Sequence, residues 1–129
     1  MIDCRELVGI PYKEKGRGVD GVDCLGLNLM VSRILGFDVP DWIYKGEEDN
    51  RNSETVRLGK EGLRAERLNF PVEGCYIEFS CIDRFHTGVY IGDGKFIHAS
   101  KSAGMVVIED LSRWRKRIKG FYNVHHKHI

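Results

Sequence analysis

The stretch Gly21–Gly36, GVDCLGLNLMVSRILG, constrains the fold of this chain more than any other. Asp23 is a good N-cap residue just ahead of it, and Gly36 supplies a stop. Between them, apolar residues recur at helical spacing, namely Leu27, Met30, Val31, Ile34 and Leu35. The sequence therefore predicts a buried helix that carries Cys24 in its first turn.

The position of Cys24 allows two interpretations. A helix N-terminus has unpaired N–H groups and about half a positive charge. The pKa of a cysteine in such a position is drawn below its ordinary value of about 8.5, which favours a thiolate nucleophile. Alternatively, Cys24 is an ordinary buried cysteine, since free cysteine is among the most buried residue types.

The composition is that of one globular domain spanning residues 1–129. Hydrophobic residues make up 42% and charged residues 30% of the 129 residues, which is enough for one core but too little for two domains. A formal net charge of +1 argues against nucleic-acid and membrane-surface partners. Residues 1–12 lack the pattern of a signal peptide, so we expect synthesis in the cytoplasm without an ordinary export signal.

The cysteines and histidines do not have the spacing of a disulfide framework or a metal site. Cys75 and Cys81 flank one predicted strand, where they would lie about 20 Å apart, too far for a disulfide. No CxxC or HxxxH pair with metal-ligand spacing lies inside the domain. We therefore expect free thiols and no metal or cofactor. The C-terminal HHKHI, with His125, His126 and His128, is expected to be a solvated terminus, and a metal-binding tail is the alternative.

Helix signals precede strand signals along the chain. Asp3–Val8 is predicted as a short helix with a capping box, residues 13–23 as a glycine-rich loop, and Ser53–Arg67 as an exposed helix or helix pair. Period-two runs predict strands at 75–80, 86–91, 95–99, 104–109 and 120–124, with a solvated basic turn at 113–119. This order indicates an α+β fold with N-terminal helices packed on a C-terminal antiparallel sheet.

His86 and His98 stand at the two ends of a predicted hairpin, HTGVYIGDGKFIH. A three-residue loop, Gly92–Gly94, would place Gly88 opposite His98 and put both histidines on one face. A two-residue loop of Asp93 and Gly94 would put them on opposite faces, because one step of register reverses every side chain. Cooperation between the histidines therefore requires the longer loop.

A thiol and two imidazoles are the parts of a catalytic triad. One imidazole takes the proton of the thiol, and the second orients the first. Cys24, His86 and His98 are therefore the candidate catalytic residues. The alternative is that each histidine is structural or merely exposed.

Two blocks of the sequence resemble a known family. They are VGIPYKEKGRGVDGVDCLGLNLMVSRILGFDVP, and FHTGVYIGDGKFIHAS followed by GMVVIEDL and a Trp/Arg-rich segment. With a Tyr before the loop, an Asp-Cys-x-Gly helix start, a His-x-Gly-Val-Tyr strand and a later His, they are similar to the NlpC/P60 family of papain-like cysteine peptidases. The likeness covers most of the chain apart from about residues 41–69. The order Cys then His resembles the ordinary members rather than the permuted acyltransferase-like branch.

The resemblance implies hydrolysis of amide bonds in peptidoglycan stem peptides, typically the bond between γ-D-glutamate and the diamino acid. It implies that Cys24 is the nucleophile, His86 the base and His98 the residue that orients His86, with the backbone N–H of Cys24 in the oxyanion hole. Tyr12 matches the family tyrosine near the thiol, and Asp23 the acidic residue that helps hold the substrate's free amine. A core tyrosine and a plain N-cap are the alternatives.

The chain departs from the family pattern at Leu25, where Ser is usual, and at Glu73-Gly74-Cys75, where Gly-Asp is common before the strand. A single domain without a signal resembles phage-tail or prophage members that a particle or secretion machine delivers to the cell wall. The expected partners are thus a peptidoglycan peptide and such delivery components.

Two other functions use the same residues. One is a non-catalytic tail or assembly module that keeps the fold as a binding surface. The other is an acyltransferase or deamidase that uses the same thiol. Turnover of muropeptides that depends on Cys24 distinguishes a hydrolase from the first, and an acyl-enzyme formed with lipid or glutamine substrates would support the second.

Overall fold

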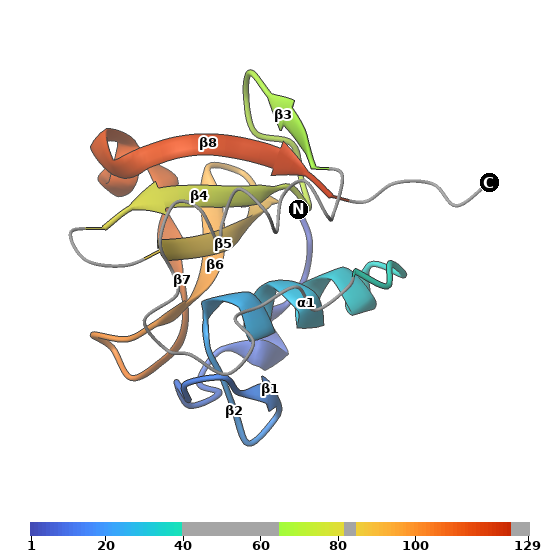
Figure 1. Ribbon diagram of the computed structural model, residues 1–129, viewed down its shortest axis with the longest axis vertical. Coiled ribbons are helices and arrows are strands. Elements are labelled where there is room, and N and C mark those ends of the chain that lie inside the picture. Colours follow the sequence, from blue (N-terminus) through green and yellow to red (C-terminus); the bar gives the residue numbers. More distant parts are fainter. Residues whose placement is uncertain (40–64, 82–84, 125–129) are drawn as a thin grey trace.

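The computed structural model describes residues 1–39, 65–81 and 85–124. Within them, a six-stranded antiparallel sheet lies against one α-helix, α1 (Figure 1). The sheet order is β3-β8-β4-β5-β6-β7. The strands are β3 (Glu66–Leu68), β4 (Tyr76–Ser80), β5 (Phe85–Gly92), β6 (Lys95–Ser100), β7 (Met105–Asp110) and β8 (Ile118–Asn123). The predicted α+β class and the five predicted strands are confirmed.

The helix α1 (Cys24–Ile34) begins and ends where the sequence predicts. The Asp23 side chain accepts a hydrogen bond from the Gly26 N–H at 2.8 Å, as an N-cap residue does. At the other end, Gly36 has a φ of +89°, a conformation that glycine adopts without strain. The chain therefore leaves the helix directly after Leu35.

The sheet has an apolar layer on each face. On one face, α1 packs against side chains of the central strands, and this core includes Leu25, Leu27, Leu29, Val31, Tyr76, Val89, Ile91, Ile97, Ala99 and Val106. On the other face, Ile77, Phe79 and Phe96 pack with Trp114 of the 3-10 helix η2 (Leu111–Arg117). Because neighbouring strand residues point to opposite faces, His86 and His98 belong to the η2 face, where their rings contact Phe79, Phe96 and Trp114.

The hairpin between β5 and β6 differs from its prediction. It has a two-residue turn, with Asp93 at φ +58° and Gly94 at φ +73°, and Gly92 pairs with Lys95. One extra residue, Ile91, forms a bulge that restores the pairing of Tyr90 with Phe96. The predicted three-residue loop is therefore wrong, but the two histidines still share a face because the bulge supplies the missing step of register.

A polar cluster joins α1 to β4 inside the core. Burial raises the pKa of Tyr76, so its hydroxyl keeps its proton. It donates to the Asn28 carbonyl at 3.2 Å and lies 2.7 Å from Ser32 Oγ. These hydrogen bonds fix the position of α1 along the strand β4.

We expect a Tyr76→Phe substitution to lower the free energy of unfolding by about 1–2 kcal/mol, since it removes two buried hydrogen bonds. Urea denaturation followed by circular dichroism measures this difference. Tyr90→Phe is the matched control, because the Tyr90 hydroxyl accepts a single, solvent-exposed bond from the Gly94 N–H. Equal losses for the two variants would contradict a role of the buried cluster in stability.

The N-terminal segment does not form the predicted capping box. Residues Arg5–Leu7 form a 3-10 helix, η1, whose N-cap is Cys4 without a side-chain bond. Asp3 instead accepts from the Arg5 backbone N–H at 3.3 Å and pairs with the Arg5 guanidinium. Glu6, three residues after Asp3, has no part in these bonds because the short helix starts after Cys4.

Three further predictions need correction. Residues 13–23 are not only a loop, because β1 (Arg17–Gly18) and β2 (Gly21–Val22) pair as a short antiparallel ribbon. The predicted helix Ser53–Arg67 lies largely outside the described residues, and its end is strand β3, where Glu66 pairs with Asn123. Most of the basic run 113–119 lies in η2 rather than in a plain turn, since Trp114 holds it on the sheet. The C-terminal HHKHI lies outside the described residues.

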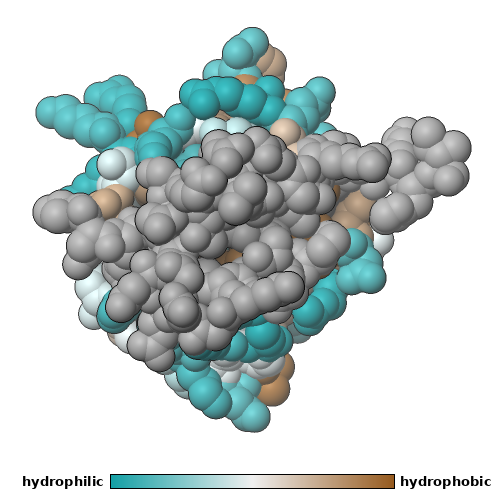
Figure 2. Space-filling view, in the orientation of Figure 1, coloured by the Kyte–Doolittle hydropathy of each residue, from teal (hydrophilic) through white to brown (hydrophobic). Residues whose placement is uncertain are grey.

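The described surface is mainly hydrophilic in the view of Figure 2. The exposed large apolar side chains that the structure describes are Met1, Val8, Val19, Ile34, Phe70, Val72 and Met105. None of the described helices is both long enough and apolar enough to cross a membrane.

Candidate active site

Cys24 is the first residue of α1 and is only 1% exposed. All four cysteines are free thiols, as predicted. Two of the others, Cys4 and Cys75, are also buried, and burial raises the pKa of each to about 11. Cys24 differs from them in its position, because it lies at the positive end of a helix of 11 residues.

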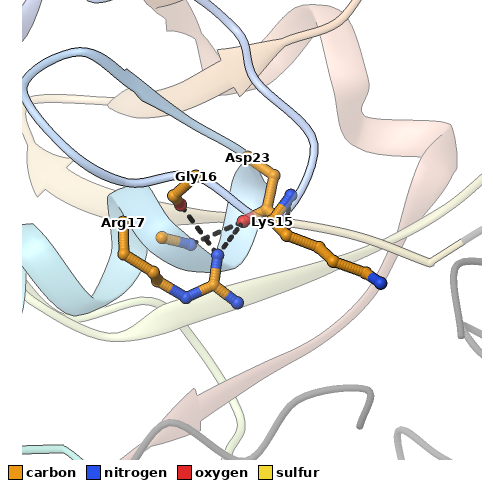
Figure 3. A network of polar contacts seen from close by, with 5 residues as sticks. Lys15, Gly16, Arg17 and Asp23 are labelled. Carbon is orange, nitrogen blue, oxygen red and sulfur yellow. Dashed lines mark hydrogen bonds and ion pairs between the residues drawn. The ribbon is translucent and has the colours of Figure 1, made fainter. Parts of the chain in front are cut away.

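Asp23 holds the loop before α1 against the helix (Figure 3). Its carboxylate is fully buried and accepts from Gly26 N–H, from Lys15 N–H at 3.1 Å and from Arg17 Nη1 at 2.8 Å. Arg17 Nη1 also donates to the Gly16 carbonyl at 2.8 Å. Asp23 is therefore both N-cap and ion-pair partner, and its role toward a substrate amine stays a prediction.

Gly26 lets the same loop lie directly on the helix. A Cβ built on Gly26 would collide with the Gly16 carbonyl oxygen and would lie 3.1 Å from Arg17 Nη1. The glycine of the Asp-Cys-x-Gly start is therefore required by backbone contact rather than by helix propensity, which glycine lowers.

Tyr12 lies beside the strand that leads into Cys24. Its backbone N–H donates to the Gly104 carbonyl at 2.9 Å, and it forms an isolated parallel bridge with Val22. The residue is partly buried and packs against the main core. The fold thus brings the Tyr12 backbone next to a residue two positions before the thiol.

His86 and His98 form a direct hydrogen bond, with Nε2 of His86 2.8 Å from Nδ1 of His98. Both side chains are buried, and His98 is 1% exposed. Trp114 stacks on the His86 ring at a centroid distance of 5.9 Å and meets the His98 ring edge-on at 5.3 Å. The two histidines predicted to cooperate are therefore joined and held by an aromatic cover.

Glu109 was missed by the reasoning from sequence. Its Oε2 lies 2.5 Å from Nε2 of His98. Burial lowers the pKa of His98, and the hydrogen bond and charge of Glu109 only partly oppose this shift. Extending the register argument to β7 could have found it, since Phe96 pairs with Glu109 and therefore brings Glu109 to the face of His98.

The helix α1 runs alongside β5 (Figure 1). Asn28 Nδ2 donates to Thr87 Oγ1 at 2.9 Å, and one turn later Ser32 meets Tyr76, which pairs with Val89. One helical turn therefore matches two residues of strand, about 6 Å along each. The helix α1 and the strand β5 therefore run parallel to each other, and their residues advance in step along this shared direction.

The described residues contain no group of three His, Cys, Asp or Glu side chains that could hold a metal ion.

No protein-family model matches the chain. It is similar to the protein of Escherichia coli strain K12 named murein DD-endopeptidase MepS/murein LD-carboxypeptidase, with 29% identity over 112 residues that cover 84% of this chain and 53% of that protein. The chain thus spans about half the length of this relative.

The fold matches solved structures. The NlpC/p60 domain of the peptidoglycan hydrolase SagA has a TM-score of 0.61 at 17% identity, covering 92% of this chain and 91% of that one. NlpC2 from Trichomonas vaginalis has a TM-score of 0.69 at 21% identity, covering 95% and 44%. The chain has the NlpC/P60 fold. The resemblance that the two sequence blocks predict is confirmed at this level.

The elements that carry the candidate catalytic residues follow one another along the chain. A helix that starts with cysteine precedes a hairpin with one histidine on each strand. Glu109 on β7, the strand that pairs with β6, adds a carboxylate to the histidine pair.

Proposed function

We propose that this chain is a cysteine hydrolase that cleaves amide bonds of peptidoglycan stem peptides, of the γ-D-glutamyl–diamino acid type. In this proposal Cys24 is the nucleophile, His86 the base and His98 the residue that orients His86. The names of the MepS and SagA relatives, murein endopeptidase and peptidoglycan hydrolase, support the substrate class.

The observation that carries the proposal is the hydrogen bond between His86 and His98, in which His86 belongs to the strand that runs alongside α1. Asn28 meets Thr87, and the helical turn before Asn28 begins at Cys24. The same spacing of about 6 Å per turn brings Cys24 level with the start of β5, where His86 lies. Thr87 faces α1 and His86 lies on the opposite face of the sheet, so in this proposal the thiol reaches the His86 imidazole around the start of β5.

The proposed reaction proceeds in two halves. The His86 imidazole takes the proton of the Cys24 thiol, and the sulfur attacks the carbonyl carbon of the scissile amide. Backbone N–H groups at the first turn of α1 stabilise the oxyanion, a contribution of about 3–4 kcal/mol for one donor in comparable sites. His86 then gives its proton to the leaving amine, and a water molecule hydrolyses the thioester and restores the thiol.

Tyr12 and Asp23 are proposed to act on the substrate side of the thiol. The backbone brings Tyr12 beside Val22, next to the turn that starts α1. Asp23 fixes that turn through Gly26 and Arg17. In this proposal Tyr12 contacts the stem peptide, and Asp23 acts at the substrate's amine.

Mass spectrometry of purified muropeptides incubated with the chain tests the proposal. We expect two products whose masses sum to that of the substrate plus one water, split between γ-D-glutamate and the diamino acid. Products split at another stem-peptide amide would overturn the bond assignment. Intact substrate would overturn the hydrolase and favour a non-catalytic module. Transfer of an acyl group to an added amine would favour the acyltransferase.

Delivery to the cell wall by a phage particle or secretion machine belongs to the same proposal. Co-purification of the chain with tail or secretion proteins from cells that encode both would support it. If the protein reached the cell wall only after lysis of the cell that made it, without a particle or secretion machine, this part of the proposal would be contradicted.

A further inference from the structure

We propose that Glu109 is a positioning residue that sets the tautomers of both histidines and thereby determines which nitrogen of His86 acts as the base. This inference rests on the proposed function. It depends on three groups in a row, in which the Glu109 carboxylate meets His98 and His98 meets His86.

The direction of each bond follows from what each group can donate. An ionised carboxylate only accepts hydrogen bonds, so Nε2 of His98 carries the proton that points to Glu109. Burial lowers the pKa of His98, which favours its neutral form. In neutral imidazole the other nitrogen has no proton, so Nδ1 of His98 accepts.

The protonation of His98 determines which nitrogen of His86 carries a proton. Its Nε2, 2.8 Å from Nδ1 of His98, must donate. In the neutral ring, Nδ1 of His86 is then the nitrogen without a proton, and it is the one able to take the proton of a thiol. With no acceptor at residue 109, His98 could equally carry its proton on Nδ1 and force the opposite tautomer on His86.

Glu109 supplies the carboxylate at the His98 end of this row. The His98 ring contacts His86 from β5, Phe96 from its own strand and Trp114 from η2. The Arg117 guanidinium lies 5.3 Å from the centre of the Trp114 ring. The Glu109 side chain is 32% exposed, so a substitution there does not open a fully buried site.

Nitrogen-15 NMR of the imidazoles at neutral pH tests the tautomers directly. We expect wild-type His98 and His86 to carry their protons on Nε2. In Glu109→Met, which has similar volume but no acceptor, we expect His98 to become a mixture of tautomers. A wild-type His98 protonated on Nδ1 would overturn the proposal even if Glu109→Met failed to fold.

Kinetics on muropeptides provide the second measurement. We expect kcat of Glu109→Met to fall by about 10- to 100-fold with little change in KM, because Glu109 acts through another residue. Glu109→Gln keeps an acceptor and is expected to restore the Nε2 tautomer and most of the lost kcat. Unchanged tautomers and unchanged kcat in Glu109→Met would overturn the proposal.

Asp110→Asn is the matched control. Asp110 is the next residue along β7, but its carboxylate pairs with Lys95 at 2.6 Å on the exposed surface. We expect neither the histidine signals nor kcat to change in this variant. The NMR result does not depend on activity. A wrong assignment of the histidine tautomers can therefore be distinguished from a wrong assignment of the hydrolase function.

Discussion

In a Cys24→Ala variant, cleavage of muropeptides is expected to fall by at least about 1,000-fold while the fold is unchanged. The reason is that alanine cannot form the covalent intermediate on which the two-step reaction depends. The thiol lies at the first turn of α1, and the cap of that turn is made by the Asp23 side chain and the Gly26 N–H. The rate of product formation, with circular dichroism as the check on folding, measures the effect.

The chain offers its own controls for this experiment. Cys4 and Cys75 are as buried as Cys24, but burial raises the pKa of each thiol to about 11, which disfavours a thiolate. Cys4→Ala and Cys75→Ala are therefore expected to keep full activity per folded molecule. If Cys24→Ala behaved like these two variants, the proposed nucleophile would be wrong.

A Gly26→Ala substitution is expected to lower the free energy of unfolding by about 2–3 kcal/mol and to reduce activity as well. The added methyl group would meet the Gly16 carbonyl oxygen, which is backbone and cannot rotate away. The loop must then move off the helix, which weakens the bonds from Lys15 and Arg17 to Asp23. Denaturant unfolding and muropeptide turnover report the two effects.

Gly18→Ala controls for the loss of a glycine in the same loop. No heavy atom lies within 4 Å of a Cβ built on Gly18, so the substitution meets open space. We expect stability and activity close to those of the wild type. Equal effects of the two substitutions would mean that the contact between loop and helix does not support the start of α1.

The main elements were predictable because their signals are local. The helix at Cys24 has an apolar face with period 3.6, an N-cap and a glycine stop within one stretch. The five strands have period-two runs in the sequence, and short turns join β5 to β6 and β6 to β7. These features depend on neighbouring residues only, so the sequence alone determines them.

The ribbon β1–β2 and the strand β3 were not predictable in the same way. β1 and β2 have two residues each, too short for any periodic pattern. β3 exists because Glu66, Arg67 and Leu68 pair with the distant strand β8, and their charged sequence otherwise favours a helix. Pairing with a distant strand decided β3, whereas β1 and β2 pair locally within one short turn.

Glu109 shows how far the site could be predicted. The pair His86 and His98 needs the register of one hairpin, which was predicted to require a three-residue loop and is instead set by a two-residue turn with a bulge. The contact from Glu109 to His98 needs the register of a second hairpin, β6–β7, as well. Each added turn multiplies the possible registers, so the contact from Glu109 follows from the sequence only if both hairpins are assigned the right register.

The bulge at Ile91 has a consequence for the natural variation of this chain. A deletion of one codon between Tyr90 and Phe96 would convert the bulged hairpin into a plain one, and those two residues would still pair. Descendants that are one residue shorter there can therefore keep both imidazoles on the same side. Between His86 and Tyr90 there is no bulged residue to lose. A deletion there would turn His86 to the opposite face from His98, so we expect selection against it.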